Sequence, residues 1–212
     1  MIGKLIRKTK EVGVGNLALG CLKVFYYRSL QKRFGFDPWH TSPYELREYV
    51  QAVAAYINRH RPECVVDIGC GLGDLLAHIQ AAKRIGVDPG KGEMEAARHL
   101  YGRQGIRFVR GSFDEFGEGM AIDYLITLNF MHGSPESIWK PAYTRICEKN
   151  QISHIIVDSY QTTEDTYRLD FDRILPENYE KGECLGVFLG DRHIYVYHRK
   201  TEPEGRISPK NR

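Results

Sequence analysis

The sequence lacks several features that would place it in a specialised class. It has no apolar run long enough for a membrane span: Val12 to Tyr27 covers 16 residues and is interrupted by glycines, Asn16 and Lys23, whereas a span needs about 20 apolar residues. It also has no internal repeat and no low-complexity tract. What is left is an ordinary globular chain, and 212 residues are enough for one substantial core.

Cysteines are few and show no pairing pattern. The five cysteines are odd in number, and none stands in a C-x-x-C arrangement. A disulfide framework and a structural zinc site are therefore not expected, because both need suitably spaced partners. We expect free thiols, mostly buried, and a reducing compartment, which predicts a cytoplasmic protein.

Dense basic tracts interleaved with aromatics are absent from the interior of the chain, so no nucleic-acid partner is expected. Residues 1–40 differ, because they carry eight Lys or Arg against two acids, a net charge of +6, while the whole chain has +3. The segment also holds an apolar stripe at helical spacing, made of Val14, Leu17, Ala18, Cys21, Leu22 and Phe25. Such a helix predicts peripheral contact of residues 12–33 with the inner face of an anionic membrane, or packing on the domain or on a second copy in a homodimer.

Apolar runs and helical patterns alternate along residues 41–199, which we take as the main domain, between the basic extension 1–40 and a flexible polar tail 200–212. Ser42-Pro43-Tyr44-Glu45 has the pattern of a capping box at the start of a helix. The expected helices are 43–59, 75–83, 93–101, 135–149 and 163–174, and the expected strands are 64–68, 84–88, 106–110, 123–129, 152–158, 183–189 and 193–198. This order predicts an α/β fold with N-terminal helices and a Rossmann-like, doubly wound, seven-stranded sheet. The sheet is mostly parallel, with an antiparallel C-terminal hairpin through Gly190-Asp191.

A glycine-rich turn follows the first strand. Asp67 to Asp74 reads Asp-Ile-Gly-Cys-Gly-Leu-Gly-Asp. Three glycines leave the backbone bare, so that a bulky ligand can approach it, and the next helix offers free amides at its start. Asp88 ends the second strand, 21 residues beyond Asp67, where its carboxylate can accept both hydroxyls of a ribose.

The same turn separates two classes of cofactor. A nicotinamide-binding turn reads Gly-x-Gly-x-x-Gly, but the sixth position counted from Gly69 is Asp74. An acid near the start of that helix would repel a pyrophosphate and is harmless to a zwitterionic amino acid. A dehydrogenase is therefore disfavoured, and the turn suits a cofactor with a zwitterionic amino acid end, such as S-adenosylmethionine.

From Tyr44 to Arg199 the chain resembles the class I S-adenosylmethionine-dependent methyltransferases. The resemblance implies a cofactor site with these residues: Asp67, Gly69, Cys70, Gly71 and Gly73 from the first motif, Asp88 for the ribose, Ser112 and Phe113 near the adenine, and Asn129 from the fourth motif. The chain departs from the family at Ser112, where many members have an aspartate. An adenine contact from Asp114 or from the backbone of Phe113 is the alternative.

Candidate catalytic residues lie after the strands or in the loop before the first helix. His132 is the first choice of base, because imidazole titrates near neutrality, and a positioning or packing histidine is the alternative. His40, beside Trp39, lies where the family commonly covers its cofactor, and these rings can equally seal the edge of the core. Asp158 ends the fifth strand and can orient a hydroxyl. No metal is expected, since no second carboxylate stands in register with it.

The expected reaction is methyl transfer to a hydroxyl of a small-molecule or saccharide acceptor. The loop 34–45 is similar to that of methyltransferase-domain proteins of bacterial surface-polysaccharide synthesis. An amine or other metabolite N-methyltransferase, which needs no strong base, and a non-catalytic cofactor-binding protein are the alternatives.

Overall fold

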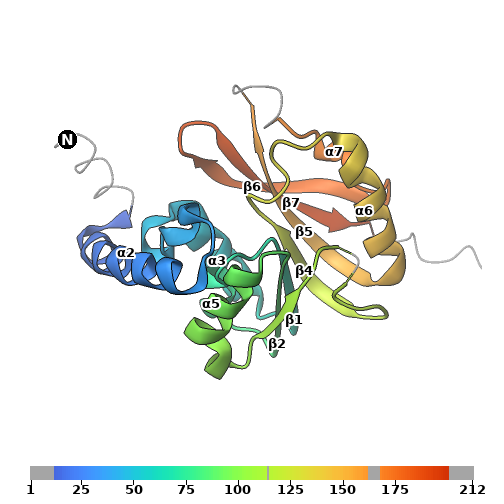
Figure 1. Ribbon diagram of the computed structural model, residues 1–212. Helices are drawn as coiled ribbons and strands as arrows, with labels where there is room; N and C mark the ends of the chain where they lie inside the picture. Colours follow the sequence, from blue (N-terminus) through green and yellow to red (C-terminus); the bar gives the residue numbers. More distant parts are fainter. Residues whose placement is uncertain (1–11, 114, 162–167, 201–212) are drawn as a thin grey trace, which may run out of the picture.

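The computed structural model describes residues 12–113, 115–161 and 168–200. One seven-stranded sheet runs through these residues in the order β3-β2-β1-β4-β5-β7-β6 (Figure 1). Strands β1 to β5 are parallel, and β7 pairs antiparallel with both β5 and β6. The strands are β1 Cys64–Ile68, β2 Lys83–Asp88, β3 Arg107–Arg110, β4 Ala121–Thr127, β5 Gln151–Tyr160, β6 Tyr179–Phe188 and β7 Arg192–Arg199. The expected Rossmann-like sheet with an antiparallel C-terminal pair is confirmed.

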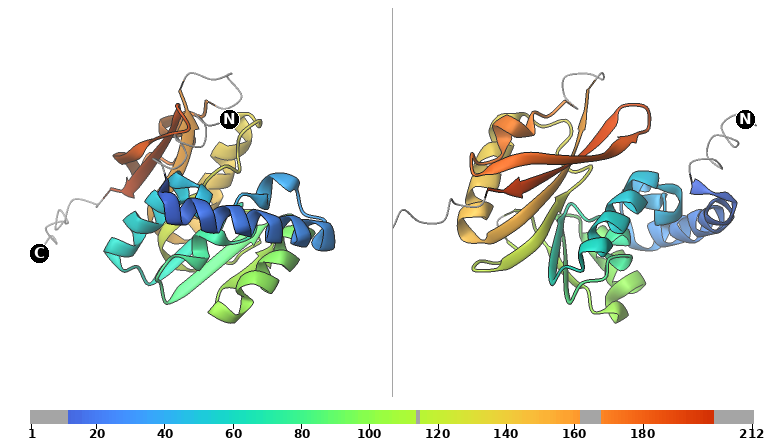
Figure 2. Two further views of the ribbon diagram at one scale, coloured as in Figure 1. Left: turned by 90° about the vertical axis from the view of Figure 1, so that its left-hand side faces the viewer. Right: turned by 180° about the vertical axis from the view of Figure 1, so that it is seen from behind.

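Helices cover both faces of this sheet (Figures 1 and 2). The helices are α3 Glu48–His60, α4 Asp74–Ala77 and α5 Lys91–Tyr101 on one face, and α6 Glu136–Lys149 and α7 Phe171–Ile174 on the other. Side chains of β1 alternate between the two cores, with Val65 on the α3 side and Val66 and Ile68 on the α6 side. A strand buried on both faces is mostly apolar, which explains the run from Cys64 to Ile68, interrupted by Asp67 alone.

Helix α2 (Val14–Phe34) packs along the edge of the domain, against α5 and the segment before α3 (Figure 1). Its buried face is formed by Gly20, Tyr27 and Leu30. A Cβ on Gly20 would lie 2.5 Å from the Leu46 side chain, so glycine permits this close approach. The predicted apolar stripe is on the opposite face, where Phe25 is 70% exposed. The helix does pack on the domain, as one of the two alternatives has it, but it makes the contact through a different face from the apolar stripe.

The start of α3 also differs from the expectation. The helix begins at Glu48, five residues after Pro43, and Tyr44–Leu46 forms a separate 3-10 turn (η2). Glu45 is buried and binds the Nζ of Lys23 on α2, so it does not reach back to cap a helix at Ser42. The predicted capping box is wrong, because the Glu45 carboxylate pairs with the Lys23 ammonium of another helix instead.

Two expected helices are shorter than predicted. Helix α4 is a single turn, because the Asn58 amide donates to the His78 carbonyl and the Asn58 oxygen accepts from the Gln80 N–H, which satisfies the backbone that would otherwise continue the helix. Within the described part of its expected range, residues 168–174, the last helix covers Phe171–Ile174, and positions 163–167 lie outside the described residues. The tail from 201 onward lies outside them as well.

All five cysteines are free thiols; Cys64 is fully buried, Cys70 and Cys147 are half-buried, and Cys21 and Cys184 are exposed, so fewer thiols are fully buried than expected. None of the described helices combines the length and the hydropathy that crossing a membrane would require.

Candidate functional site

A cavity of about 440 Å³ lies at the carboxyl edge of the sheet, a size typical of small-molecule and cofactor sites. Loops after β1, β2 and β4 form one wall, and the segment 39–50 and the β6–β7 turn close it. The residues that line it are Trp39, His40, Ser42, Leu46, Arg47, Glu48, Tyr49, Val50, Asp67, Gly69, Cys70, Gly71, Leu75, Asp88, Pro89, Leu128, Asn129, Phe130, Phe188, Leu189 and Arg192. The cavity therefore joins the glycine turn to three segments far away in sequence.

The glycine turn has a backbone that only glycine adopts easily. Gly69, Gly71 and Gly73 all have positive φ angles, of 77°, 53° and 80°. A Cβ on Gly71 would lie 2.6 Å from Nδ1 of His40, and one on Gly69 would lie 2.5 Å from the Phe130 side chain. Any other residue would strain the turn and push these two rings into the cavity.

Asp88 is held by backbone amides at the cavity wall. Its Oδ2 accepts from the Gly71 N–H at 3.0 Å and its Oδ1 accepts from the Gly90 N–H at 2.9 Å. Burial raises the pKa of Asp88, while the two amide bonds oppose that shift. A carboxylate has about four acceptor positions, so two remain for a pair of ribose hydroxyls. The bare turn and this anchored acid thus fit the cofactor that the sequence predicts.

Asp67 is the second acid in the cavity wall. It is buried, and burial together with the nearby Asp88 raises its pKa to about 8, with Arg47 acting against the shift. Such a carboxyl is ready to ionise when a cation arrives beside it. Cys70 lies next to the pair, and burial raises the pKa of its thiol well above the ordinary value, so it stays protonated and is not a nucleophile.

His40 closes the cavity over the glycine turn. It lies in the 3-10 turn η1 (Pro38–Thr41), which begins where the Asp37 carboxylate accepts the Trp39 N–H at 3.1 Å. Burial lowers the pKa of His40, although Asp88 and Glu93 oppose the shift. The imidazole is therefore neutral near pH 7 and can accept a proton. Trp39 lines the same mouth and is 54% exposed.

His132 and Asp158, predicted from separate loops, are brought together behind the cavity. The Nε2 of His132 lies 3.1 Å from Oδ2 of Asp158, whose other oxygen accepts the Asn129 N–H at 2.8 Å. Neither His132 nor Asp158 is among the residues that line the cavity, whereas Asn129 is. The pair lies behind the cavity wall and contacts it through the Asn129 N–H, which donates to Asp158.

The expected adenine-contacting residues are not in the cavity wall. Phe113 is buried in the core against Tyr143, with ring centroids 5.1 Å apart, and the Ser112 N–H bonds to the Glu115 carboxylate. Position 114 lies outside the described residues. The contact of Ser112 or Phe113 with a cofactor stays a prediction. Among the described residues no cluster of three His, Cys, Asp or Glu could hold a metal ion.

Arg47, Tyr49 and Arg192 are among the charged or polar residues of the cavity that were not predicted as site residues. Arg47 and Tyr49 are at the start of α3, and no motif marks them. Arg192 carries a usable signal, because β7 is antiparallel and so begins where the parallel strands end, opposite Tyr160 of β5. A polar residue at the start of a strand that runs antiparallel to its parallel neighbour belongs to the ligand edge by the same rule as one at the end of a parallel strand.

No protein-family model and no curated protein sequence matches the chain. Solved structures do match its fold. The magnesium protoporphyrin IX methyltransferase of Synechocystis PCC 6803 with bound S-adenosylmethionine has a TM-score of 0.63 and 15% identity, over 87% of this chain and 97% of that one. The N-methyltransferase NodS of Bradyrhizobium japonicum WM9 with bound S-adenosyl-L-homocysteine has a TM-score of 0.61 and 15% identity, over 83% of this chain and 98% of that one. An rRNA methylase from Escherichia coli has a TM-score of 0.58 and 17% identity, over 90% of this chain and 76% of that one. At these identities the likeness is one of fold, and the chain has the fold of the S-adenosylmethionine-dependent methyltransferases.

Proposed function

We propose that the protein transfers a methyl group from S-adenosylmethionine to a small-molecule acceptor. The observation that carries this is the glycine turn facing a cavity whose wall holds Asp88 by two backbone amides. When bound, the cofactor supplies an activated methyl group on a sulfonium. Asp88 would accept the ribose hydroxyls, and Asp67 would lie beside the ammonium of the amino acid end. Arg47, whose buried Nε has no hydrogen-bond partner, would bind its carboxylate.

For a hydroxyl acceptor we propose His40 as the base, in place of the sequence's first choice, His132. His40 lines the cavity, lies against Gly71 and is kept neutral by burial. His132 instead bonds to Asp158 behind the wall. We assign His132 and Asp158 to positioning, because Asp158 fixes the Asn129 backbone that forms part of the cavity.

The acceptor atom decides whether a base is needed at all. Methyl transfer is an in-line displacement, so positioning supplies most of the rate and a base is required chiefly for a hydroxyl. We propose a hydroxyl on a small molecule or a saccharide, with an amine as the second candidate. Loss of turnover in His40→Gln would support the hydroxyl, and full turnover would support the amine. A nucleic-acid acceptor is not proposed, because the sequence lacks a basic tract interleaved with aromatics.

Two measurements test the proposal. Calorimetry with S-adenosylhomocysteine and with NAD should show binding of the first alone, and binding of NAD alone would refute the cofactor assignment. Incubation with methyl-labelled cofactor and fractions of a cell extract should then label a small-molecule or glycan fraction. Cofactor binding without labelling of any fraction would indicate a non-catalytic binding protein.

We also propose that the outward face of α2 binds an anionic membrane. Large apolar side chains stand exposed along its first half, with Val14 at 72%, Leu22 at 70% and Phe25 at 70%. The helix contains no acid, and Lys32 and Arg33 lie in its last turn. Apolar insertion combined with basic charge is what an anionic lipid surface attracts. A homodimer through the same face is the competing occupant.

Vesicle sedimentation separates the two. The protein should bind vesicles of phosphatidylcholine with phosphatidylserine and not vesicles of phosphatidylcholine alone, and a Leu22→Gln/Phe25→Gln variant should lose binding. Ile138→Gln on α6, a residue 54% exposed, is the matched control. Absence of vesicle binding, together with a dimer in light scattering that the double variant dissociates, would assign the face to a second copy.

A further inference from the structure

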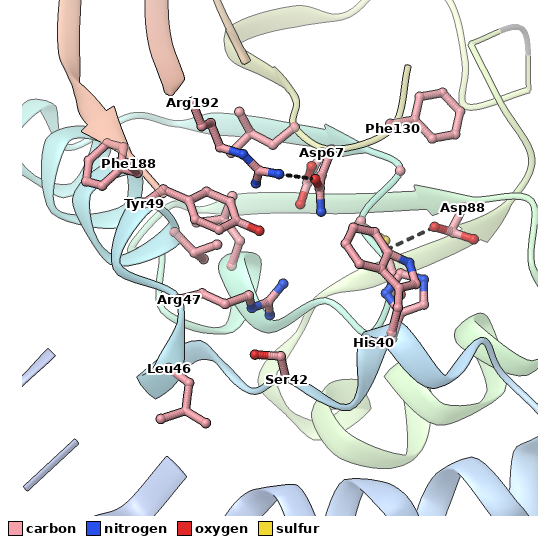
Figure 3. A pocket seen from close by; sticks show the side chains of 18 of the residues that line it. His40, Ser42, Leu46, Arg47, Tyr49, Asp67, Asp88, Phe130, Phe188 and Arg192 are labelled. Atoms are coloured by element: carbon pink, nitrogen blue, oxygen red, sulfur yellow. Dashed lines mark hydrogen bonds between the residues drawn. The ribbon is translucent and has the colours of Figure 1, made fainter. Parts of the chain in front are cut away.

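The cavity has two chemically different ends (Figure 3). Asp88 and His40 lie at one end, beside the glycine turn, and Arg192, Tyr49 and Phe188 lie at the other (Figure 3). The first end is the one that the proposed function assigns to the cofactor. The second end is left for the acceptor, and its most polar group is a buried cation.

Arg192 is built into this end by contacts on almost every side. Its side chain is 6% exposed, and its guanidinium carbon lies 4.4 Å from the ring centroid of Tyr49 and 5.0 Å from that of Tyr160. Nη2 donates to Oδ1 of Asn129 at 2.6 Å, and Nε donates to the Tyr160 hydroxyl at 2.7 Å. Two rings and two acceptors thus hold the guanidinium plane in one orientation, so it is preorganised for a ligand.

One nitrogen of Arg192 is left over. Nη1 is buried and has no hydrogen-bond partner, although the residue lines the cavity. A buried donor without a partner is costly, more so when it is charged, and native structures rarely keep one without a reason. Asp158 does not satisfy it, because that carboxylate approaches Nε, at 3.5 Å, and also holds His132 and the Asn129 N–H.

The surroundings of Arg192 indicate what kind of anion would fit. Phe188, Leu189 and Tyr49 give this end of the cavity apolar walls. A phosphate dianion would bring more charge and more acceptor oxygens than one free nitrogen can satisfy. A carboxylate attached to an apolar or aromatic body matches both the one free nitrogen, with its two N–H groups, and the walls.

We propose that Arg192 binds the carboxylate of the methyl acceptor, so that the acceptor is a small apolar or aromatic carboxylic acid. This rests on the proposed function, because it takes the glycine-turn end of the cavity as the place of the cofactor. The carboxylate at the amino acid end of the cofactor is the other group that could bind Arg192. Arg47 is better placed for that group, because it binds Asp74, the first residue of the helix that follows the glycine turn.

The first test uses matched pairs of acids and amides on protein saturated with S-adenosylhomocysteine. The probes are 4-hydroxybenzoate, 4-hydroxycinnamate and octanoate, each compared with its primary amide by ligand-observed NMR titration. At least one acid should bind about tenfold more tightly than its amide, as expected for a charge-assisted pair. Equal binding of acid and amide in all three pairs would overturn the proposal, and this comparison needs only the unmodified protein.

Variants then assign the preference to Arg192. Arg192→Gln should abolish the difference between acid and amide, Arg192→Lys should keep part of it, and Arg107→Gln, an exposed arginine on the opposite edge strand β3, should leave it unchanged. A preference that persists in Arg192→Gln would overturn the proposal. If Arg192→Gln does not fold, Arg192→Lys decides, because a lysine ammonium lacks the planar guanidinium that Tyr49, Tyr160 and Asn129 orient and should still reduce the preference.

A final arm separates the two sources of carboxylate. The ligands compared are S-adenosylhomocysteine and its decarboxylated analogue, which ends in a 3-aminopropyl chain. The ratio of their dissociation constants should be the same in the unmodified protein and in Arg192→Gln. A difference that disappears in Arg192→Gln would assign Arg192 to the cofactor and overturn the acceptor assignment. Failure of S-adenosylhomocysteine to bind at all would instead refute the proposed function, so the two failures are distinguishable.

Discussion

The buried carboxyl of Asp67 should give cofactor binding a measurable dependence on pH. In the ligand-free protein burial, assisted by Asp88, raises the pKa of Asp67 to about 8, so the group is mostly protonated at pH 7. A ligand that places an ammonium beside it favours the ionised form. Binding of S-adenosylhomocysteine should therefore release a proton at pH values below about 8 and release none well above it.

The size of the effect follows from the position of that pKa. If only the ionised form binds, the apparent dissociation constant grows about tenfold for each pH unit below the pKa. With a pKa of about 8, affinity should weaken about fifty-fold when the pH falls from 8 to 6. Above pH 9 it should be nearly constant, apart from titration of the ligand itself.

Calorimetry in two buffers of different ionisation enthalpy measures both the affinity and the number of protons released. Asp67→Asn is the matched control, because the ionisation of the ligand is common to both proteins and only the carboxyl is removed. The variant should bind more weakly, with a flat pH profile and no proton release attributable to the protein. An affinity that does not change with pH in the unmodified protein, or an equal slope in Asp67→Asn, would refute the reasoning.

Four further outcomes are expected. The raised pKa of Asp67 means that ionising this carboxyl lowers the stability of the folded protein as the pH rises from about 4 towards 8. Asp67→Asn should therefore stabilise the ligand-free protein in urea unfolding at pH 8 and not at pH 4. His40→Gln should lower kcat by about 10²-fold or more while the dissociation constant of S-adenosylhomocysteine changes little. Leu189 is an exposed leucine in the β6–β7 turn with a φ of 53°, a left-handed conformation that asparagine adopts more easily. Leu189→Asn should therefore raise the free energy of unfolding by about 1 kcal/mol, as measured by calorimetric melting. Tyr27→Phe, which removes a hydroxyl bonded to Asp74 at 2.7 Å, should cost about 1–3 kcal/mol in urea unfolding, whereas Tyr26→Phe, 47% exposed, should cost almost nothing.

The end of the cavity that we propose for the cofactor could be predicted, because its residues are nearly contiguous in sequence. A buried strand, a glycine turn and a helix start occupy residues 64–77, and Asp88 ends the strand that pairs with β1. The strand pattern places both acids at the same edge of the sheet, so position in the fold follows from position in the chain. His40 could be named for a similar reason, as part of a loop before the first helix of the domain.

The end of the cavity that we propose for the acceptor could not be predicted in the same way, because each of its groups depends on a partner far away in sequence. Arg192 is oriented by Asn129, 63 residues earlier, and by the rings of Tyr49 and Tyr160. The buried face of α2 is likewise chosen by Leu46, Glu45 and Asp74, while the sequence shows an equally apolar stripe on the opposite face. Periodicity measures which faces are apolar, but it does not say which of two apolar faces has a complementary surface waiting for it.

The same long-range contacts connect the outside of the molecule to the site. Tyr27 of α2 donates to Asp74, which also binds Arg47, and Arg47 lines the cavity. Lys23 of the same helix binds Glu45, directly before the cavity residues Leu46 and Arg47. We therefore expect a displacement of α2 to reach the cavity wall through these charged and hydrogen-bonded groups, since polar networks of this kind are rigid. If α2 binds a membrane as we propose, vesicles containing phosphatidylserine should change the affinity for S-adenosylhomocysteine. Tyr27→Phe should weaken that coupling without weakening vesicle binding, and an affinity insensitive to vesicles that do bind would separate the surface from the site.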